Sequence, residues 1–168
     1  VDTKIYRSNE RIQEIDIIIT DKQVVENAVK KVDIAKEAVR VTSQKLTVIQ
    51  GEIDIVTSKH ESGEKRLYSG TVTNPKELKD LQDQGAALTR RINELEDNKL
   101  EAMIIEEDRK ETLEETVRGY DTVVDQRNKL ENELRLEHES LANLISTLSV
   151  EREVALNSVP KEVLANYD

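Results

Sequence analysis

The sequence predicts an all-α fold: an elongated antiparallel coiled-coil hairpin of two helices. Apolar residues recur at alternating steps of three and four, and only two prolines, Pro75 and Pro160, interrupt the 168 residues. Phe and Trp are absent, and the aromatic content is 2%. Because compact cores of this size normally use large aromatic side chains, the supply of Val, Ile, Leu and Ala indicates a narrow seam between helices.

Residues 1–66 are expected to form the first helix of the coiled coil. Steps of three and four place their apolar side chains on one side of a helix, as in left-handed supercoils. The predicted seam comprises Ile5, Ile12, Ile15, Ile19, Val25, Val29, Val32, Val39, Leu46, Ile49, Ile53 and Val56.

Residues 75–157 are expected to form the second helix, after a turn at 67–74. Asn74 can cap the first backbone N–H groups, Pro75 suits the first helical position, and Glu77 is placed to complete a capping box. Residues 158–168 are expected to be a connector with a possible short helix. The second seam comprises Leu78, Leu81, Leu88, Ile92, Leu95, Leu113, Tyr120, Val123, Leu130, Leu134, Leu141, Leu144 and Leu148.

A turn centred near Gly70 fixes the predicted register of the hairpin. Ile53 is then expected to face Leu88, and Ile12 to face Leu130. In this register the second helix extends past the first, and an apolar end patch is left for residues upstream of Val1, another chain or another domain to cover. The patch comprises Leu141, Leu144, Ile145 and Leu148.

Two features interrupt the regular pattern. Between Lys99 and Arg109 the seam turns polar while Met103, Ile104 and Ile105 fall out of phase, which predicts a stutter or kink, with an exposed apolar docking patch as the alternative. Single glycines inside helical segments predict points of local weakness or bending. These are Gly51, Gly63, Gly85 and Gly119, of which Gly85 occupies a seam position and would leave a hole or allow a close helix approach.

Composition argues against several functional classes. The net charge of −10 repels phosphate backbones, and the absence of cysteine removes thiolate metal sites and disulfides. The run Ile17–Ile19 is far shorter than the ~20 apolar residues of a membrane span. His60 and His138 are expected to be structural or solvated. No nucleophile–base pair or metal-ligand set can be assembled, so we expect a cytoplasmic protein that is not an enzyme.

The turn is the candidate partner-binding site, because its local charge reverses. Lys59, Lys65, Arg66, Lys76 and Lys79 outnumber the nearby glutamates, and an aromatic residue lies beside them. A turn held only by Leu67 and Tyr68 packing on Leu78 is the competing interpretation. The candidate residues are Arg66, Tyr68, Ser69, Gly70, Asn74, Pro75 and Glu77.

The stretch from Arg66 to Gln82 resembles a bacterial family of coiled-coil hairpin proteins that carry a C-terminal four-cysteine zinc ribbon. Leu95-Glu96-Asp97 and Val159–Leu164 are also similar to that family. Its members are described as cytoplasmic nucleic-acid-binding proteins, some linked to the nitrogen-type alternative sigma factor and to messenger RNA in flagellar regulation. The resemblance implies two Cys-x-x-Cys pairs that bind zinc beyond Tyr167, outside this sequence.

Three functional hypotheses follow. The first is an adaptor that binds protein partners, with a transcription factor or sigma subunit as the class that the resemblance implies. The second is a nucleic-acid-binding protein whose RNA or DNA contacts lie in the zinc ribbon. The third is a structural coiled coil that associates with itself through Leu141 to Leu148.

Overall fold

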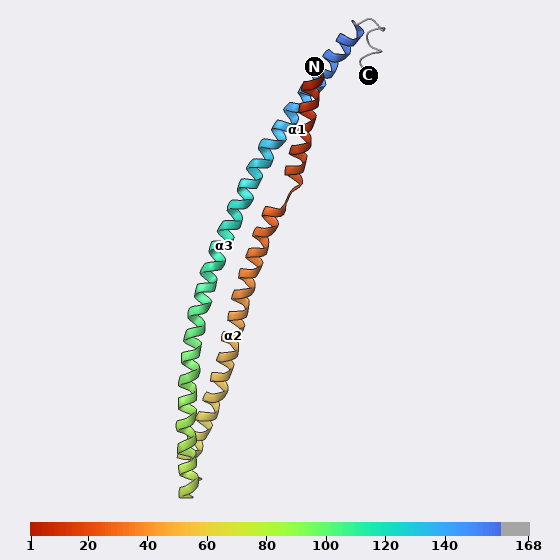
Figure 1. The fold of residues 1–168 in the computed structure, drawn as a ribbon. Helices are drawn as coiled ribbons and strands as arrows, with labels where there is room; N and C mark the ends of the chain where they lie inside the picture. The colour runs from red at the N-terminus through yellow and green to blue at the C-terminus, as the bar shows by residue number, and fades with distance from the viewer. Residues whose placement is uncertain (159–168) are drawn as a thin grey trace. The chain divides into compact units, whose positions relative to one another are not determined.

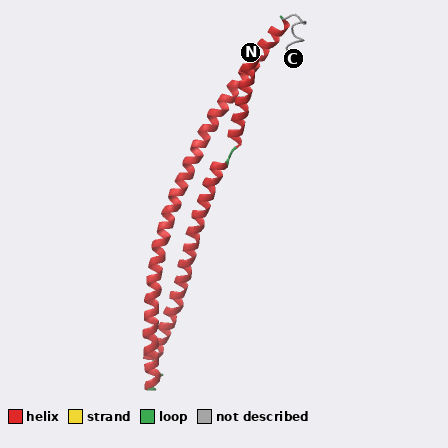
Figure 2. Ribbon diagram, in the orientation of Figure 1, coloured by secondary structure: helices red, strands yellow, loops and turns green. Residues whose placement is uncertain are grey.

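The computed structural model describes residues 1–158, and these residues form three helices (Figure 1). They are α1 (Asp2–Thr20), α2 (Gln23–Tyr68) and α3 (Pro75–Asn157). Figure 2 shows helices joined by short loops, with no strand in the described part of the chain. The all-α helical hairpin is confirmed. The predicted connector lies, apart from Ser158, outside the described residues.

The chain divides into two compact units, which we call the terminal unit and the tip unit. The terminal unit joins Val1–Val29 to the residues from Gly119 onward, and the tip unit is Lys30–Arg118. Each unit pairs part of the first arm of the hairpin with an antiparallel part of α3. A narrow seam of aliphatic residues therefore replaces a globular core in both units.

The core of the tip unit is a cluster on the predicted seam. Ile49, Ile53, Leu95 and Ala102 are each at most 9% exposed and pack together, with Leu46 against them. The predicted register was wrong, because Ile53 packs in a cluster with Leu95 rather than Leu88, one heptad further along α3. The loop 69–74 lets α3 begin beyond the end of α2 (Figure 1), which displaces the pairing.

The first arm is not one helix, in contrast to the prediction for residues 1–66. α1 ends at Thr20 and α2 begins at Gln23, whose N–H donates to the side-chain oxygen of Asp21 at 2.9 Å. Asp21 has an extended backbone, so it ends one helix and caps the next. The predicted weak points lie inside continuous helices instead, Gly51 and Gly63 in α2 and Gly119 in α3.

The terminal unit buries Ile15 completely, with Leu134 and Leu148 at 6% and 7% exposed. The prediction that the whole end patch is uncovered was therefore wrong for Leu148. The register explains this, because Asp2 pairs with Arg152 at 2.7 Å, so α1 reaches further along α3 than expected. Leu141 and Ile145 are half-buried, and Leu144 is 44% exposed.

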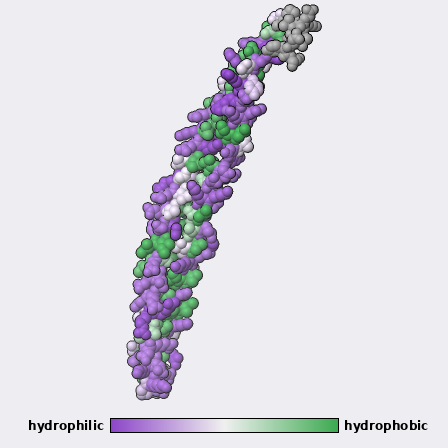
Figure 3. All heavy atoms as spheres, viewed as in Figure 1, coloured by the Kyte–Doolittle hydropathy of each residue, from purple (hydrophilic) through white to green (hydrophobic). Residues whose placement is uncertain are grey.

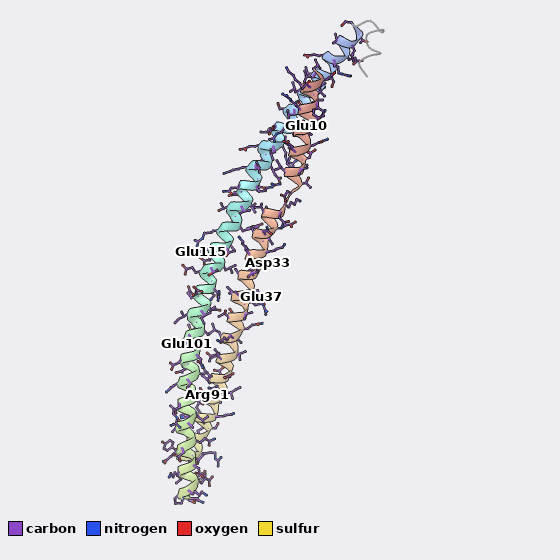
Figure 4. All side chains as sticks on the ribbon, viewed as in Figure 1. Glu10, Asp33, Glu37, Arg91, Glu101 and Glu115 are labelled. Atoms are coloured by element: carbon purple, nitrogen blue, oxygen red, sulfur yellow. The ribbon has the colours of Figure 1, made fainter. Side chains whose placement is uncertain are left out.

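Much apolar surface stays outside the seam. Figure 3 shows hydrophobic side chains reaching the surface between hydrophilic ones, and charged residues such as Glu37 and Glu101 project from the helices (Figure 4). Within the described residues, no helix is both long enough and apolar enough to cross a membrane.

Candidate functional site

The loop at the tip is fixed by hydrogen bonds of its own residues. After α2 ends at Tyr68, the Ser69 hydroxyl hydrogen-bonds the Arg66 carbonyl at 2.9 Å and lies 2.6 Å from the Thr71 hydroxyl. Gly70 has a φ of 71°, a left-handed backbone that favours glycine over any residue with a side chain. Ser69 and Gly70 therefore end α2 and turn the chain, which explains their place in the turn motif.

The start of α3 follows the predicted capping pattern in part. The Asn74 side-chain oxygen accepts the N–H of Lys76 at 3.0 Å, and Pro75 occupies the first helical position. Glu77, expected to complete a capping box, instead accepts a hydrogen bond from Arg66 at 3.2 Å. This ion pair joins the end of α2 to the start of α3 and restrains the loop between them.

Tyr68 stands out from this fixed loop, since 79% of its surface is exposed. The interpretation in which Tyr68 packs on Leu78 was wrong for Tyr68, whereas Leu67 and Leu78 are both half-buried. The tip thus combines a rigid backbone, a cationic Arg66 and a free aromatic side chain. Aromatic and arginine side chains are the residue types most enriched at the energetic centres of protein interfaces.

Hollows lie beside the tip where the seam carries glycine. Gly63 of α2 and Gly85 of α3 line the same groove, of about 210 Å³, together with Leu67 and Leu81. A Cβ added at either glycine would meet nothing within 4 Å, so the hole predicted at Gly85 is present and the helices do not close on it. A second groove of about 340 Å³ is lined by Gly63, Leu81 and Arg66.

His60 and His138 both contact protein groups. The His60 ring lies 3.1 Å from the Thr89 hydroxyl across the seam and 3.9 Å from Glu64. His138 lies 3.7 Å from Asp16. Among the described residues there is no cluster of three or more His, Cys, Asp or Glu side chains that could hold a metal ion.

The polar side chains in this stretch of the seam are paired across the helices. Lys99 donates to Gln50 at 2.6 Å, and Ser43 hydrogen-bonds Glu106. Buried Leu95 and Ala102, with half-buried Glu106, keep the heptad spacing along α3, so the predicted stutter was wrong. Ala102 is not among the predicted seam residues, because a seam pattern of larger apolar side chains does not include alanine.

The out-of-phase residues of this stretch lie on the surface of α3. Met103, Ile104 and Ile105 are 48%, 72% and 45% exposed, and Leu100 is 59% exposed. Exposure is the condition that the alternative prediction of a docking patch requires. Their binding of a partner stays a prediction.

Hydrogen bonds lower the pKa of two glutamates of α3. Arg11 hydrogen-bonds Glu137 through two nitrogens at 2.8 and 3.1 Å and lowers the pKa of that carboxyl. The Ser43 hydroxyl and then Lys110 lower the pKa of Glu106. Hydrogen bonds to the charged form favour it, so both carboxylates are held ionised. The hydrogen bonds from Arg11 and Ser43 link these glutamates of α3 to the first arm of the hairpin.

Comparison with known proteins identifies the fold family. A family model described as a CT398-like coiled coil hairpin domain matches residues 3–168. No curated protein and no solved structure matches the chain. The family match covers both arms and the tip of the hairpin, and it agrees with the helices described above.

Proposed function

Because the chain belongs to the CT398-like coiled coil hairpin domain family, we propose that it is a non-enzymatic adaptor whose tip binds a protein partner. The observation that carries this proposal is the 79% exposure of Tyr68 beside a loop fixed by its own hydrogen bonds. A preorganised loop loses little conformational entropy on binding, which favours affinity. An exposed tyrosine on a rigid base is suited to insertion into a pocket of a partner.

The grooves beside the tip support the same role. They leave space next to Leu67 and Leu81, where an apolar side chain of the partner can pack. Arg66 lies on the rim of the larger groove, where it can pair with a carboxylate of the partner. The partner class that the resemblance of Arg66–Gln82 suggests is a sigma subunit of the nitrogen type.

The test measures binding of a purified nitrogen-type sigma factor to the 168-residue chain. Tyr68→Ala is expected to weaken binding at least about tenfold, the effect of removing an aromatic anchor. Tyr6→Ala is the matched control, since Tyr6 is an exposed tyrosine of α1. Equal affinity of the Tyr68 variant and the parent would remove the tip from the proposal, and no binding by the parent would remove this partner class.

A nucleic-acid-linked role is the second candidate, and it rests on the zinc ribbon that the resemblance implies. The net charge of −10 opposes RNA binding along the helices, so contacts would lie in the ribbon. We expect negligible RNA affinity for residues 1–168. A protein that includes the ribbon should bind about one zinc and show salt-dependent RNA binding. Tight RNA binding by residues 1–168 alone would contradict this candidate.

Self-association through the end patch is the third candidate. Leu148 is buried inside the terminal unit, which leaves Leu144 as the most exposed member of the patch. We therefore expect the chain to sediment as a monomer at micromolar concentration. A dimer that Leu144→Gln dissociates would favour this candidate over the adaptor.

A further inference from the structure

A second row of apolar residues follows α2 on its outer surface. Ile34, Val41, Val48 and Ile55 recur at intervals of one heptad and are 71%, 52%, 61% and 57% exposed. Single exposed apolar residues are ordinary on protein surfaces. Four β-branched residues in one heptad position are a different case, because this spacing is the repeat that packs helices together. We call these four residues the outer stripe.

The outer stripe is separate from the seam inside the tip unit. The seam positions of α2 in this stretch include Thr42, Ile49 and Ile53, each at most 9% exposed. With about 100° between successive residues of a helix, the stripe points roughly 130° away from the centre of that seam. The stripe therefore contributes nothing to the burial that holds the hairpin together.

Lysine dominates the flank of the stripe that lies nearer to α3. The positions four residues after the stripe residues are Ala38, Lys45, Glu52 and Lys59, and Lys31 precedes them. Glu52 is already paired with Arg91 of α3 at 3.6 Å, and Arg91 is labelled in Figure 4. Within the described part of the chain, Lys31, Lys45 and Lys59 make no ion pair, although the protein has a net charge of −10.

The other flank of the stripe begins with Lys30 and Glu37 and then carries small or uncharged side chains. Gln44, Gly51 and Ser58 lie there, and a Cβ added at Gly51 would meet nothing within 4 Å. Glu37, on the same flank, is already hydrogen-bonded to Arg40. This flank allows a close approach and leaves the lysines as the unpaired charges beside the stripe.

A groove continues the stripe at one end. It is lined by Ile34, Ala35 and Ala38 of α2 and by Thr112 and Thr116 of α3, and its volume is about 210 Å³. The small side chains leave space for a larger apolar residue. A partner lying on the stripe can therefore place a side chain into the tip unit as well as onto α2.

We propose that the outer stripe is a second coiled-coil seam, and that it binds one amphipathic helix of a partner protein whose apolar residues are flanked by Asp and Glu. Only a helix repeats its contacts every seven residues, whereas a strand repeats them every two. Acidic flanks neutralise Lys31, Lys45 and Lys59. This surface is distinct from the tip, so it does not depend on the binding role of Tyr68.

A second copy of the chain fits this surface poorly. If two stripes pack antiparallel, Val41 meets Val48 of the other copy, and Lys45 then lies opposite Lys45. Parallel packing places the lysine flank beside the other flank of the second copy, where Gln44, Gly51 and Ser58 carry no charge that could neutralise Lys45 and Lys59. Because like charges at flanking positions oppose pairing, the charge pattern favours a different, acidic helix.

The experiment measures binding of two synthetic four-heptad peptides to the full 168-residue chain by fluorescence anisotropy. Both peptides carry Ile and Leu at their seam positions, and their flanking residues are all Glu in one and all Lys in the other. The Glu peptide is expected to bind at least about tenfold more tightly than the Lys peptide. Added salt should weaken the binding of the Glu peptide.

Matched variants test whether binding uses the stripe. Val41→Gln with Val48→Gln should weaken binding of the Glu peptide at least about tenfold. Leu136→Gln with Val150→Gln, at exposed apolar positions of α3, should leave that binding unchanged. Lys45→Glu with Lys59→Glu should reverse the preference between the peptides. Lys36→Glu with Lys79→Glu changes the net charge by the same amount but lies outside the stripe. This control should still bind the Glu peptide more tightly than the Lys peptide. Circular dichroism confirms that each variant stays helical.

Several results would overturn the proposal. They are failure of the parent to bind the Glu peptide, equal binding after the change at Val41 and Val48, and equal binding of the two peptides. Sedimentation of the chain without peptide tests the second copy as occupant. A dimer that the change at Val41 and Val48 dissociates would assign the stripe to self-association instead.

Discussion

The guanidinium of Arg127, on α3, donates hydrogen bonds to the main-chain carbonyls of Ile18 and Ile19 at 2.5 and 2.9 Å. These carbonyls belong to the last turn of α1, where no following turn can supply a donor. The side chain of Arg127 is only 16% exposed and also pairs with Glu131 at 3.2 Å. One arginine of α3 thus caps the carboxyl end of α1 where the first arm is interrupted.

Replacing Arg127 should destabilise the terminal unit. Arg127→Met keeps the aliphatic stem but removes both donors, and hydrogen bonds involving a charged group contribute about 1.5–3 kcal/mol. We expect the free energy of unfolding in urea to fall by about 1–3 kcal/mol. Arg90→Met, at an exposed position of α3, is the control and should change it little. Equal stability of the two variants would show that water satisfies these carbonyls as well as Arg127 does.

The pair between Arg11 and Glu137 predicts a pH dependence. Because the pKa of Glu137 is lower in the folded chain than the ordinary value near 4.3, the folded state is favoured above that value. This contribution is lost as the pH falls through the folded pKa. Glu137→Gln should lower the thermal midpoint at pH 7, and the difference from the parent should shrink below about pH 4. A difference that stays constant down to pH 2 would contradict the cause assigned here.

Replacing the glycines near the tip by alanine should change the free energy of unfolding in opposite directions. Gly63 and Gly85 lie inside helices with nothing near an added Cβ, so each alanine should stabilise by up to about 1 kcal/mol. Gly70 has a φ of 71°, so Gly70→Ala should destabilise by about 1–2 kcal/mol. Urea midpoints measure both effects. A stabilising Gly70→Ala would mean that the loop readily adopts another backbone.

The polar layer formed by Gln50 and Lys99 should be replaceable only as a pair. Gln50→Leu alone removes the acceptor of Lys99 and should lower the free energy of unfolding. Gln50→Leu with Lys99→Leu should raise it by about 1–2 kcal/mol through apolar burial. Urea unfolding measures whether the free energy of unfolding falls for the single variant and rises for the double variant. If Gln50→Leu alone raises the free energy of unfolding, apolar packing stabilises this layer at least as well as the 2.6 Å hydrogen bond from Lys99 to Gln50 does.

The sequence pattern was sufficient to predict the fold class and most of the seam. Ile15, Ile49, Ile53, Leu95 and Leu134 are buried as the spacing requires. The register was not predictable in the same way, since moving one helix by a heptad preserves every apolar match. The loop geometry and the polar pairs decide the register, and neither is encoded in the periodicity.

Small and polar residues account for the remaining errors. Ala102 is 1% exposed and Thr42 is 9% exposed, with the Thr42 hydroxyl hydrogen-bonded to the carbonyl of Ala38. A search for large apolar residues passes over both. The interruption at Asp21 contains no glycine, so glycine positions alone do not predict it. An aspartate that can cap a helix after the β-branched run Ile17 to Thr20 was the available signal.

Within the tip unit, the groove lined by Gly63 and Gly85 makes packing weaker near the loop than in the cluster further along the helices. Side chains bury little surface at that level, whereas Ile49, Ile53 and Leu95 form a continuous cluster further from the loop. Segments with few apolar contacts exchange their amide hydrogens at a lower free-energy cost than well-packed ones. The last turns of α2 and the first turns of α3 are therefore expected to exchange their amide hydrogens faster than the cluster does.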